Sequence, residues 1–261
     1  MKAYVFPGQG SQKPGMGQDL FNDVEESREL FKKANDILNF NITELMFEGT
    51  SEDLLQTKVT QPAIFIHSVI SALTSKTFKP DVCAGHSLGE FSALVATKSV
   101  SFEDGLKLVS IRANAMQRAC QETKGTMAAI LGLSDDIVES ACNEIDGIVK
   151  PANYNCPGQL VISGELNAVE KTCELLKEKG ARRALILPVG GAFHSDLMNS
   201  ASNELKKGIN NIDFKAPNCP IYQNFTASAV IDPLFIRENL LNQLTGPVLW
   251  TQSINKMISN G

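Results

Sequence analysis

The chain has 261 residues, of which 43% are hydrophobic and 20% are charged. This composition is typical of a globular protein, and it excludes the fibrous, collagen-like and disordered classes. The 24 Lys and Arg residues and 29 Asp and Glu residues give a formal net charge of -5. We therefore expect binding neither to nucleic acid nor to an anionic membrane, because both need an excess of basic residues.

The N-terminal half alternates short β-type runs with longer helical patterns, which predicts an α/β core. The expected elements, in chain order, are a strand over Ala3 to Phe6, a helix over Asp19 to Asn39, helices starting at Ser51 and after Pro62, a buried strand over Pro80 to Gly85, a helix from Ser87, and a helix from Phe102 through Met116.

The middle of the chain follows a different order, β-α-β-β-α-β. Its expected elements are strands over Thr126 to Leu133, Ile148 to Pro151, Leu160 to Ser163 and Ala184 to Val189, and helices over Asp135 to Glu144 and Ala168 to Lys179. This order is typical of a ferredoxin-like unit. We therefore predict a ferredoxin-like subdomain at residues 125–190, inserted into a hydrolase-like parallel-sheet core of residues 1–124 and 191–261. The active site is expected in the cleft between these two parts.

The cysteines indicate the compartment. None of the six has the Cys-x-x-Cys spacing of a zinc or redox site, so we expect free thiols in a reducing compartment. The apolar N-terminal stretch is too short for a signal-peptide core, and no run of about 18 apolar residues predicts a spanning helix. These patterns predict a cytoplasmic protein with no membrane partner.

The strongest local signal is Gly85-His86-Ser87-Leu88-Gly89, a G-x-S-x-G sequence between a predicted strand and a predicted helix. At such a turn the flanking glycines are needed because backbone segments crowd there, and the serine hydroxyl is lifted clear as a nucleophile. The helix N-terminus behind it favours developing negative charge. The alternative is a Gly-Ser turn that only caps the next helix.

A nucleophilic serine needs a base, and the chain has three histidines. His86 adjoins Ser87 and is expected to point elsewhere, while the apolar neighbours of His67 indicate a core histidine. His194, in a loop at a predicted subdomain boundary, is the base candidate by elimination. Asp196 and Asp232 are available as a third member, or a carbonyl group could orient the imidazole instead.

The N-terminal loop Phe6 to Gln12 invites comparison with a phosphate-binding loop, but it lacks the required residues. Lys13 occupies the position of the third glycine in Gly-x-Gly-x-x-Gly, and Met16 replaces the Walker-A lysine. An exposed N–H of this loop suits an oxyanion hole instead, together with the N–H of Leu88.

Seven segments in register resemble the malonyl-CoA:acyl-carrier-protein transacylases of type II fatty acid synthesis and the acyltransferase domains of polyketide synthases. They are FPGQGSQ at 6–12, TQPA at 60–63, GHSLGEFSALVA at 85–96, the helix of Arg112, NYNCPGQLVISG at 153–164, GAFHS at 191–195 and QLTGPVLW at 243–250. The resemblance implies transfer of malonyl from malonyl-CoA to the phosphopantetheine thiol of acyl carrier protein for fatty acid synthesis, by a ping-pong mechanism through a malonyl-serine ester. It implies a monomer with no metal and no further cofactor.

The resemblance also implies roles for individual residues. Ser87 corresponds to the nucleophile, His194 to the general base, and Gln243 to the residue whose carbonyl orients the histidine. The backbone N–H groups of Gln9 and Leu88 correspond to the oxyanion donors. The residues that correspond to substrate-binding positions are Arg112 (for the malonyl carboxylate), Asn153, Asn155, Phe193 and Met116.

Judged from its helix alone, Arg112 is a solvated surface arginine. The chain also departs from the family pattern in two places. Cys156 stands where a serine is common, and members usually continue past the position of Gly261 with a further strand and helix.

Three rival functions share parts of this pattern. A serine esterase or patatin-like hydrolase would have the same turn, a polyketide-pathway acyltransferase would have the same chemistry, and a non-catalytic carrier-docking module would need neither Ser87 nor His194.

Overall fold

The computed structural model describes residues 1–261 and has a mixed α/β fold. The chain forms two compact units. Unit 1 comprises Met1–Asn114, Leu205–Gln223 and Ser228–Arg237, and unit 2 comprises Ala115–Glu204, Asn224–Ala227 and Glu238–Gly261. The domain boundaries expected from the sequence, with a subdomain at 125–190, stay a prediction.

Unit 1 holds a parallel-rich sheet of four strands in the order β1-β2-β7-β8. Its strands are β1 (Ala3–Phe6), β2 (Val82–Gly85), β7 (Ile221–Gln223) and β8 (Ser228–Val230). β1 and β7 pair parallel to β2, while β8 pairs antiparallel to β7. Because Phe6 pairs with Gly85 at the ends of two parallel strands, the loops that follow both strands leave the sheet at the same edge. The predicted strands at 3–6 and before Gly85 are confirmed.

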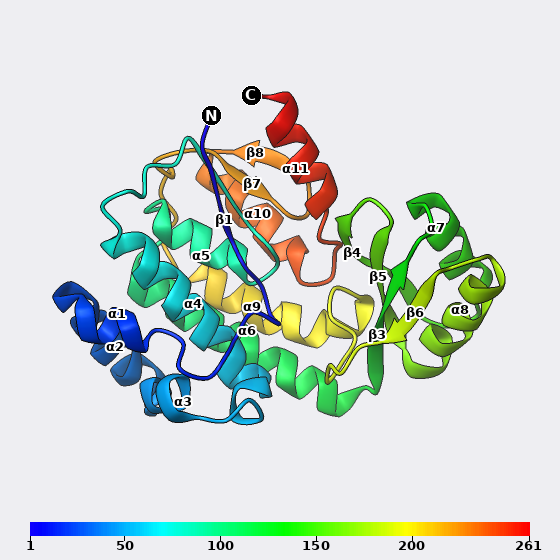
Figure 1. Cartoon of the computed structure of the whole chain (residues 1–261), viewed down its shortest axis with the longest axis horizontal. Coiled ribbons are helices and arrows are strands. Elements are labelled where there is room, and N and C mark those ends of the chain that lie inside the picture. The colour runs from blue at the N-terminus through cyan, green and yellow to red at the C-terminus, as the bar shows by residue number, and fades with distance from the viewer. The chain divides into compact units, whose positions relative to one another are not determined.

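Several helices accompany this sheet (Figure 1). They are α1 (Gln18–Asp23), α2 (Glu25–Leu38), α3 (Ile42–Glu48), a 3-10 turn (Asp53–Leu55), α4 (Thr57–Thr74) and α5 (Gly89–Ala96). α6 (Phe102–Glu122), α9 (Asn199–Asn210) and α10 (Pro233–Gln243) each contribute residues to both units. α4 is buried around most of its circumference, and its buried residues include the polar Thr60 and Gln61 as well as its apolar side chains.

Three expectations for unit 1 are wrong in detail. The single helix expected over Asp19 to Asn39 is two helices, since Val24 has an extended backbone (φ -122, ψ 110). The helix expected at Ser51 is only the 3-10 turn. The helix expected after Pro62 begins at Thr57, with Pro62 inside it. Proline so near a helix start removes a single backbone hydrogen bond, and the burial of the helix outweighs that loss.

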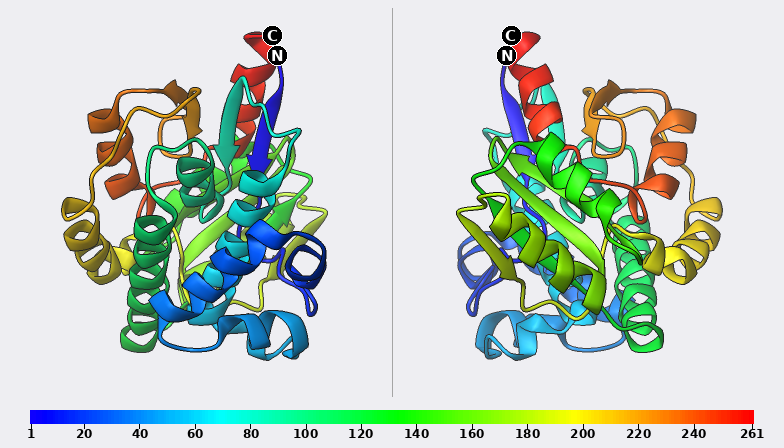
Figure 2. Two further views of the ribbon diagram at one scale, coloured as in Figure 1. Left: turned by 90° about the vertical axis from the view of Figure 1, so that its left-hand side faces the viewer. Right: turned by 90° about the vertical axis from the view of Figure 1, so that its right-hand side faces the viewer.

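Unit 2 contains a separate antiparallel sheet in the order β4-β5-β3-β6. Its elements are β3 (Gly125–Leu131), α7 (Asp135–Glu144), β4 (Val149–Cys156), β5 (Gln159–Glu165), α8 (Leu166–Glu178) and β6 (Arg183–Ile186). All three strand pairings are antiparallel, and the predicted β-α-β-β-α-β order is confirmed. Helices α7 and α8 lie over one face of the sheet in the right-hand view of Figure 2, and apolar residues of both helices form its core with those of β3, β4 and β5.

The remaining elements of unit 2 are a 3-10 turn (Asp196–Met198) and α11 (Trp250–Ser259). Val248, just before α11, forms a parallel bridge with Asn153 of β4. No helix in the chain is both long enough and apolar enough to cross a membrane.

The core of the antiparallel sheet yields a stability prediction. Ile162→Ala removes a fully buried side chain from β5 and is expected to lower the free energy of unfolding by about 2–5 kcal/mol. Ile186→Ala in edge strand β6 is the matched control, because Ile186 is 47% exposed. This substitution should lower the free energy of unfolding by less than about 1 kcal/mol. Urea unfolding of both variants measures the difference. Equal decreases in the free energy of unfolding for the two variants would contradict the burial of Ile162 in the core of this sheet.

Candidate active site

Ser87 lies at the sharp turn between β2 and α5. Its backbone φ is 51°, in the left-handed region that a non-glycine residue rarely adopts. Such strain persists only where the surroundings enforce it, and a strained strand-to-helix turn is typical of a nucleophilic serine. The residue is half-buried at this turn.

Backbone crowding explains the two glycines of the motif. A Cβ on Gly85 would lie 1.9 Å from the carbonyl carbon of Gly89, and a Cβ on Gly89 would lie 2.2 Å from the carbonyl oxygen of Phe6. Both contacts are with backbone atoms that have no freedom to move aside. The backbone crowding predicted from G-x-S-x-G is therefore confirmed, and the structure adds that the end of β1 takes part in it.

Arg112 of α6 is buried beside Ser87, with 1% of its surface exposed, so its interpretation as a solvated helix arginine is wrong. Its Nη2 donates a hydrogen bond of 2.9 Å to Ser87 Oγ, and its Nη1 donates one of 2.7 Å to Gln61 Oε1. The guanidinium carbon lies 5.5 Å from the centre of the Phe91 ring, within range of a cation–π contact.

Burial lowers the pKa of Arg112 to about 10, while the negative charge of Glu90 acts in the opposite direction. Arg112 therefore stays protonated at neutral pH. A fixed guanidinium beside a serine hydroxyl is suited to an acyl group that carries its own carboxylate, because the planar fork binds a carboxylate with two parallel hydrogen bonds.

The loop after β1 lies next to this turn. A Cβ on Gly8 would lie 2.6 Å from the carbonyl oxygen of His86. The loop is held by a hydrogen bond of 2.9 Å from Ser11 Oγ to the carbonyl oxygen of Gly8. No hydrogen bond occupies the backbone N–H of Gln9 or of Leu88. Both N–H groups are thus available as donors, which an oxyanion hole requires.

His194 belongs to unit 2 and is 3% exposed, with a left-handed φ of 59°. Its Nδ1 lies 3.0 Å from the backbone oxygen of Gln243 and 3.1 Å from that of Gly246. A ring nitrogen facing two carbonyl oxygens carries the proton, since carbonyl groups only accept. Nε2 is then the basic nitrogen, and the two carbonyls orient the ring.

The two acidic candidates for a third member have other partners. Asp196 Oδ1 accepts a hydrogen bond of 2.8 Å from Lys150 Nζ, and Asp232 Oδ1 accepts one of 2.8 Å from the backbone N–H of Leu234. Of the alternatives that the sequence left open, the structure therefore favours the carbonyl group.

The other predicted substrate-binding residues are placed as follows. Phe193 is 6% exposed directly before His194, and Met116 is 2% exposed, one turn after Arg112 on α6. Asn153 and Asn155 lie on β4, and Asn153 Oδ1 is buried without a hydrogen bond. Gln61 and Glu90 were not predicted as site residues, although both lie in segments that carry the family resemblance, Gln61 in TQPA at 60–63 and Glu90 in GHSLGE at 85–90.

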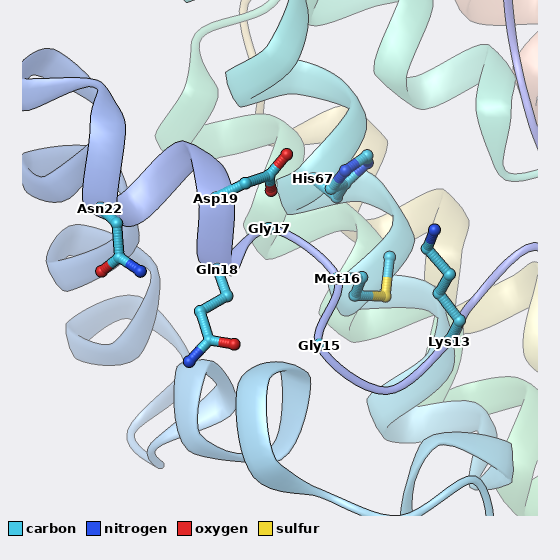
Figure 3. Close-up of a pocket in the computed structure, with 8 residues that line it drawn as sticks. All are labelled: Lys13, Gly15, Met16, Gly17, Gln18, Asp19, Asn22 and His67. Carbon is cyan, nitrogen blue, oxygen red and sulfur yellow. The ribbon is translucent and has the colours of Figure 1, made fainter.

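His67 was expected to be a core residue, and this prediction is wrong, because the residue is only half-buried. It lines a polar pocket of about 350 Å³ in unit 1, where Figure 3 shows Asp19 and Lys13 on either side of it. Desolvation lowers its pKa, an effect that Asp19 opposes and Lys13 reinforces. No group of three or more His, Cys, Asp or Glu side chains is arranged to hold a metal ion.

Comparison with known proteins gives a consistent result. Residues 3–261 match the family described as the acyl transferase domain. The chain is 41% identical to the malonyl CoA-acyl carrier protein transacylase of Bacillus subtilis (strain 168), over 99% of this chain and 83% of the relative.

Two solved structures are also similar. An acyl carrier protein S-malonyltransferase from Vibrio cholerae has a TM-score of 0.95 and 41% identity, covering 99% of this chain and 86% of that one. A malonyl-transacylase in complex with its type II PKS acyl-carrier protein has a TM-score of 0.94 and 38% identity, covering 99% and 85%.

The crowded turn yields a second prediction. Gly89→Ala is expected to lower the free energy of unfolding by about 3 kcal/mol or more, because its Cβ meets the backbone of Phe6. Gly190→Ala is the control, since nothing lies within 4 Å of the added methyl group, and its effect should stay within about 0.5 kcal/mol. A Gly89→Ala protein with wild-type stability in thermal or urea unfolding would refute the crowding argument.

Proposed function

The chain belongs to the acyl transferase domain family, and from this premise we propose that it transfers the malonyl group of malonyl-CoA to the phosphopantetheine thiol of acyl carrier protein. The observation that carries the proposal is the hydrogen bond of 2.9 Å from buried Arg112 to Ser87 Oγ. It joins a cation suited to a free carboxylate with a hydroxyl suited to attack. Similarity to proteins named for this reaction supports the same substrate.

In the first half of the proposed ping-pong cycle, Ser87 Oγ attacks the thioester carbonyl of malonyl-CoA while His194 Nε2 takes the hydroxyl proton. The N–H groups of Gln9 and Leu88 stabilise the oxyanion. The carbon–sulfur bond then breaks, and the CoA thiolate receives the proton from His194. Arg112 binds the malonyl carboxylate throughout, and the acyl group is held as a serine ester.

In the second half, the pantetheine thiol of the carrier protein replaces CoA. His194 takes the thiol proton, the thiolate attacks the serine ester, and Ser87 leaves with that proton. The carbonyls of Gln243 and Gly246 hold Nδ1 protonated, so the same nitrogen, Nε2, serves both halves. The residues that we propose line the acyl and thioester sites are Phe193, Met116, Asn153 and Asn155.

The proposal extends to finer features of the fold and location. The strand order of the antiparallel sheet and its β-α-β-β-α-β sequence support a ferredoxin-like subdomain at 125–190, inserted into a hydrolase-like core. Six free cysteines support a cytoplasmic location.

A carrier protein of polyketide synthesis is the second candidate partner, since one similar structure is a complex with such a protein.

The nucleophile is tested by substitution. Ser87→Ala should abolish the covalent malonyl adduct that intact-protein mass spectrometry detects after mixing with malonyl-CoA. Ser92→Ala is a matched control, because it removes a fully buried hydroxyl of α5 that has no hydrogen-bond partner, and the adduct should persist. An adduct of unchanged amount on the Ser87→Ala protein would overturn the assignment. Release of free malonate without transfer to a carrier protein would favour the esterase alternative.

The carboxylate role of Arg112 is tested by specificity. Arg112→Ala is expected to lower kcat/KM for malonyl-CoA roughly 100-fold, which corresponds to about 3 kcal/mol for a buried charge-assisted pair, with a much smaller loss for acetyl-CoA. Arg118→Ala on the same helix, which removes an exposed ion pair with Glu204, should leave both values unchanged. Equal losses for the two substrates would remove the carboxylate role.

A further inference from the structure

His194 has a backbone conformation that needs support from its surroundings. Its φ of 59° lies in the left-handed region, which costs free energy for any residue with a Cβ atom, and the residue is almost fully buried. The backbone oxygens of Gln243 and Gly246 contact its ring nitrogen Nδ1. They orient the ring only if the backbone that carries it is held in this conformation.

The hydroxyl of Ser195, the next residue, ties this backbone segment together. Ser195 Oγ donates a hydrogen bond of 2.6 Å to the backbone oxygen of Ala192, and it accepts one of 3.3 Å from the backbone N–H of Leu197. The two bonds join the residue two positions before His194 to the residue three positions after it. Ser195 is fully buried, so bulk water does not compete with these bonds.

The two residues that Ser195 joins also pack against the antiparallel sheet. A Cβ on Gly125, the first residue of β3, would lie 2.7 Å from Cβ of Ala192 and 3.1 Å from Cδ1 of Leu197. Glycine at position 125 thus leaves the space in which both residues rest on β3. Packing on β3 and the hydrogen bonds of Ser195 therefore act on the same two residues of the loop.

From this arrangement, and resting on the proposed function, we propose that Ser195 is a positioning residue for the general base. Its hydroxyl maintains the left-handed backbone of His194, and this backbone keeps Nδ1 at the two carbonyl oxygens and leaves Nε2 as the base. Without the hydroxyl, the carbonyl of Ala192 and the N–H of Leu197 lose these hydrogen bonds, and the loop relaxes to regain partners for them. The base is then misplaced, although no group that touches the substrate has been removed.

Ser195→Ala tests the proposal through the rate of malonyl-Ser87 ester formation, measured by rapid quench and intact-protein mass spectrometry over a range of malonyl-CoA concentrations. We expect the maximal rate constant to fall about tenfold or more, because a positioned general base contributes a factor of about 10² to 10⁴. The malonyl-CoA concentration that gives half of the maximal rate should stay unchanged. The rate constant with acetyl-CoA should fall by the same factor, since the base acts on the Ser87 hydroxyl whichever acyl group is transferred.

Ser253→Ala is the matched control in the same unit. Ser253 of α11 is likewise fully buried, and its Oγ donates a hydrogen bond of 2.9 Å to the backbone oxygen of Leu249. This substitution should lower the free energy of unfolding to a similar extent as Ser195→Ala and leave the rate constants of ester formation unchanged. Ser195→Thr keeps the hydroxyl and should recover most of the lost rate.

A merely structural role for Ser195 would lower the stability of the Ser195→Ala protein but leave its rate constant at the wild-type value, and this result overturns the proposal. A loss confined to malonyl-CoA, or a rise in the half-saturating concentration alone, also overturns it, because the hydroxyl would then serve substrate binding. The proposal equally fails if a folded Ser195→Thr protein is as slow as Ser195→Ala.

Folding of each variant is checked by circular dichroism. If neither variant at position 195 folds, the hydroxyl is needed for folding and the proposal is wrong. Failure of the proposed function is seen separately, since the wild-type protein would then form no malonyl ester with malonyl-CoA.

Discussion

The part of the candidate site that lies in unit 1 depends on one constraint, the close approach of three backbone segments around Ser87. β2 must end, turn and enter α5 within a few residues while the end of β1 packs against the first turn of that helix. There is space for this only because Gly85 and Gly89 lack side chains. The same crowding holds Ser87 in a left-handed conformation and leaves the N–H of Leu88 available. Strain at one residue is thus maintained by packing of the elements around it.

Burial of charge is the second physical feature of this site. A guanidinium and a carboxylate, Arg112 and Glu90, are both almost completely removed from water within unit 1. Such a pair contributes little to stability compared with apolar side chains of the same volume, because desolvation offsets the attraction. The value of the buried guanidinium lies in chemistry, because it forms strong, oriented hydrogen bonds to a carboxylate.

His194 in unit 2 is oriented by neutral groups and not by a charged one. Two backbone carbonyls face Nδ1 of His194, where many serine enzymes place an aspartate. Carbonyl dipoles fix the tautomer and the ring orientation but stabilise the imidazolium less than a full negative charge would. In the proposed reaction CoA leaves as a weakly basic thiolate, and the more basic oxygen of Ser87 leaves only as it receives the proton that His194 took from the incoming thiol.

The residue pattern alone predicts the strands at 3–6 and 80–85, the β-α-β-β-α-β order of the middle segment, and the need for glycine on both sides of Ser87. The strands and their order depend on local spacing, and Gly85 is crowded by its neighbours Gly89 and Glu90, but the carbonyl oxygen of Phe6 that crowds Gly89 belongs to a distant segment. The residue pattern also reduced three histidines to one base candidate, although it described His67 as a core residue when it lines a pocket.

The burial of Arg112, its hydrogen bond to Gln61, and the carbonyl partners of His194 in place of Asp196 and Asp232 become evident only from the packing of the whole chain. The helix pattern around Arg112 is the same whether that side chain faces water or the core. Its environment is built by α4 and α5, which are separate segments of the chain. Burial, and the electrostatics that follow from it, depend on how distant segments pack, and no local pattern of residues contains that information.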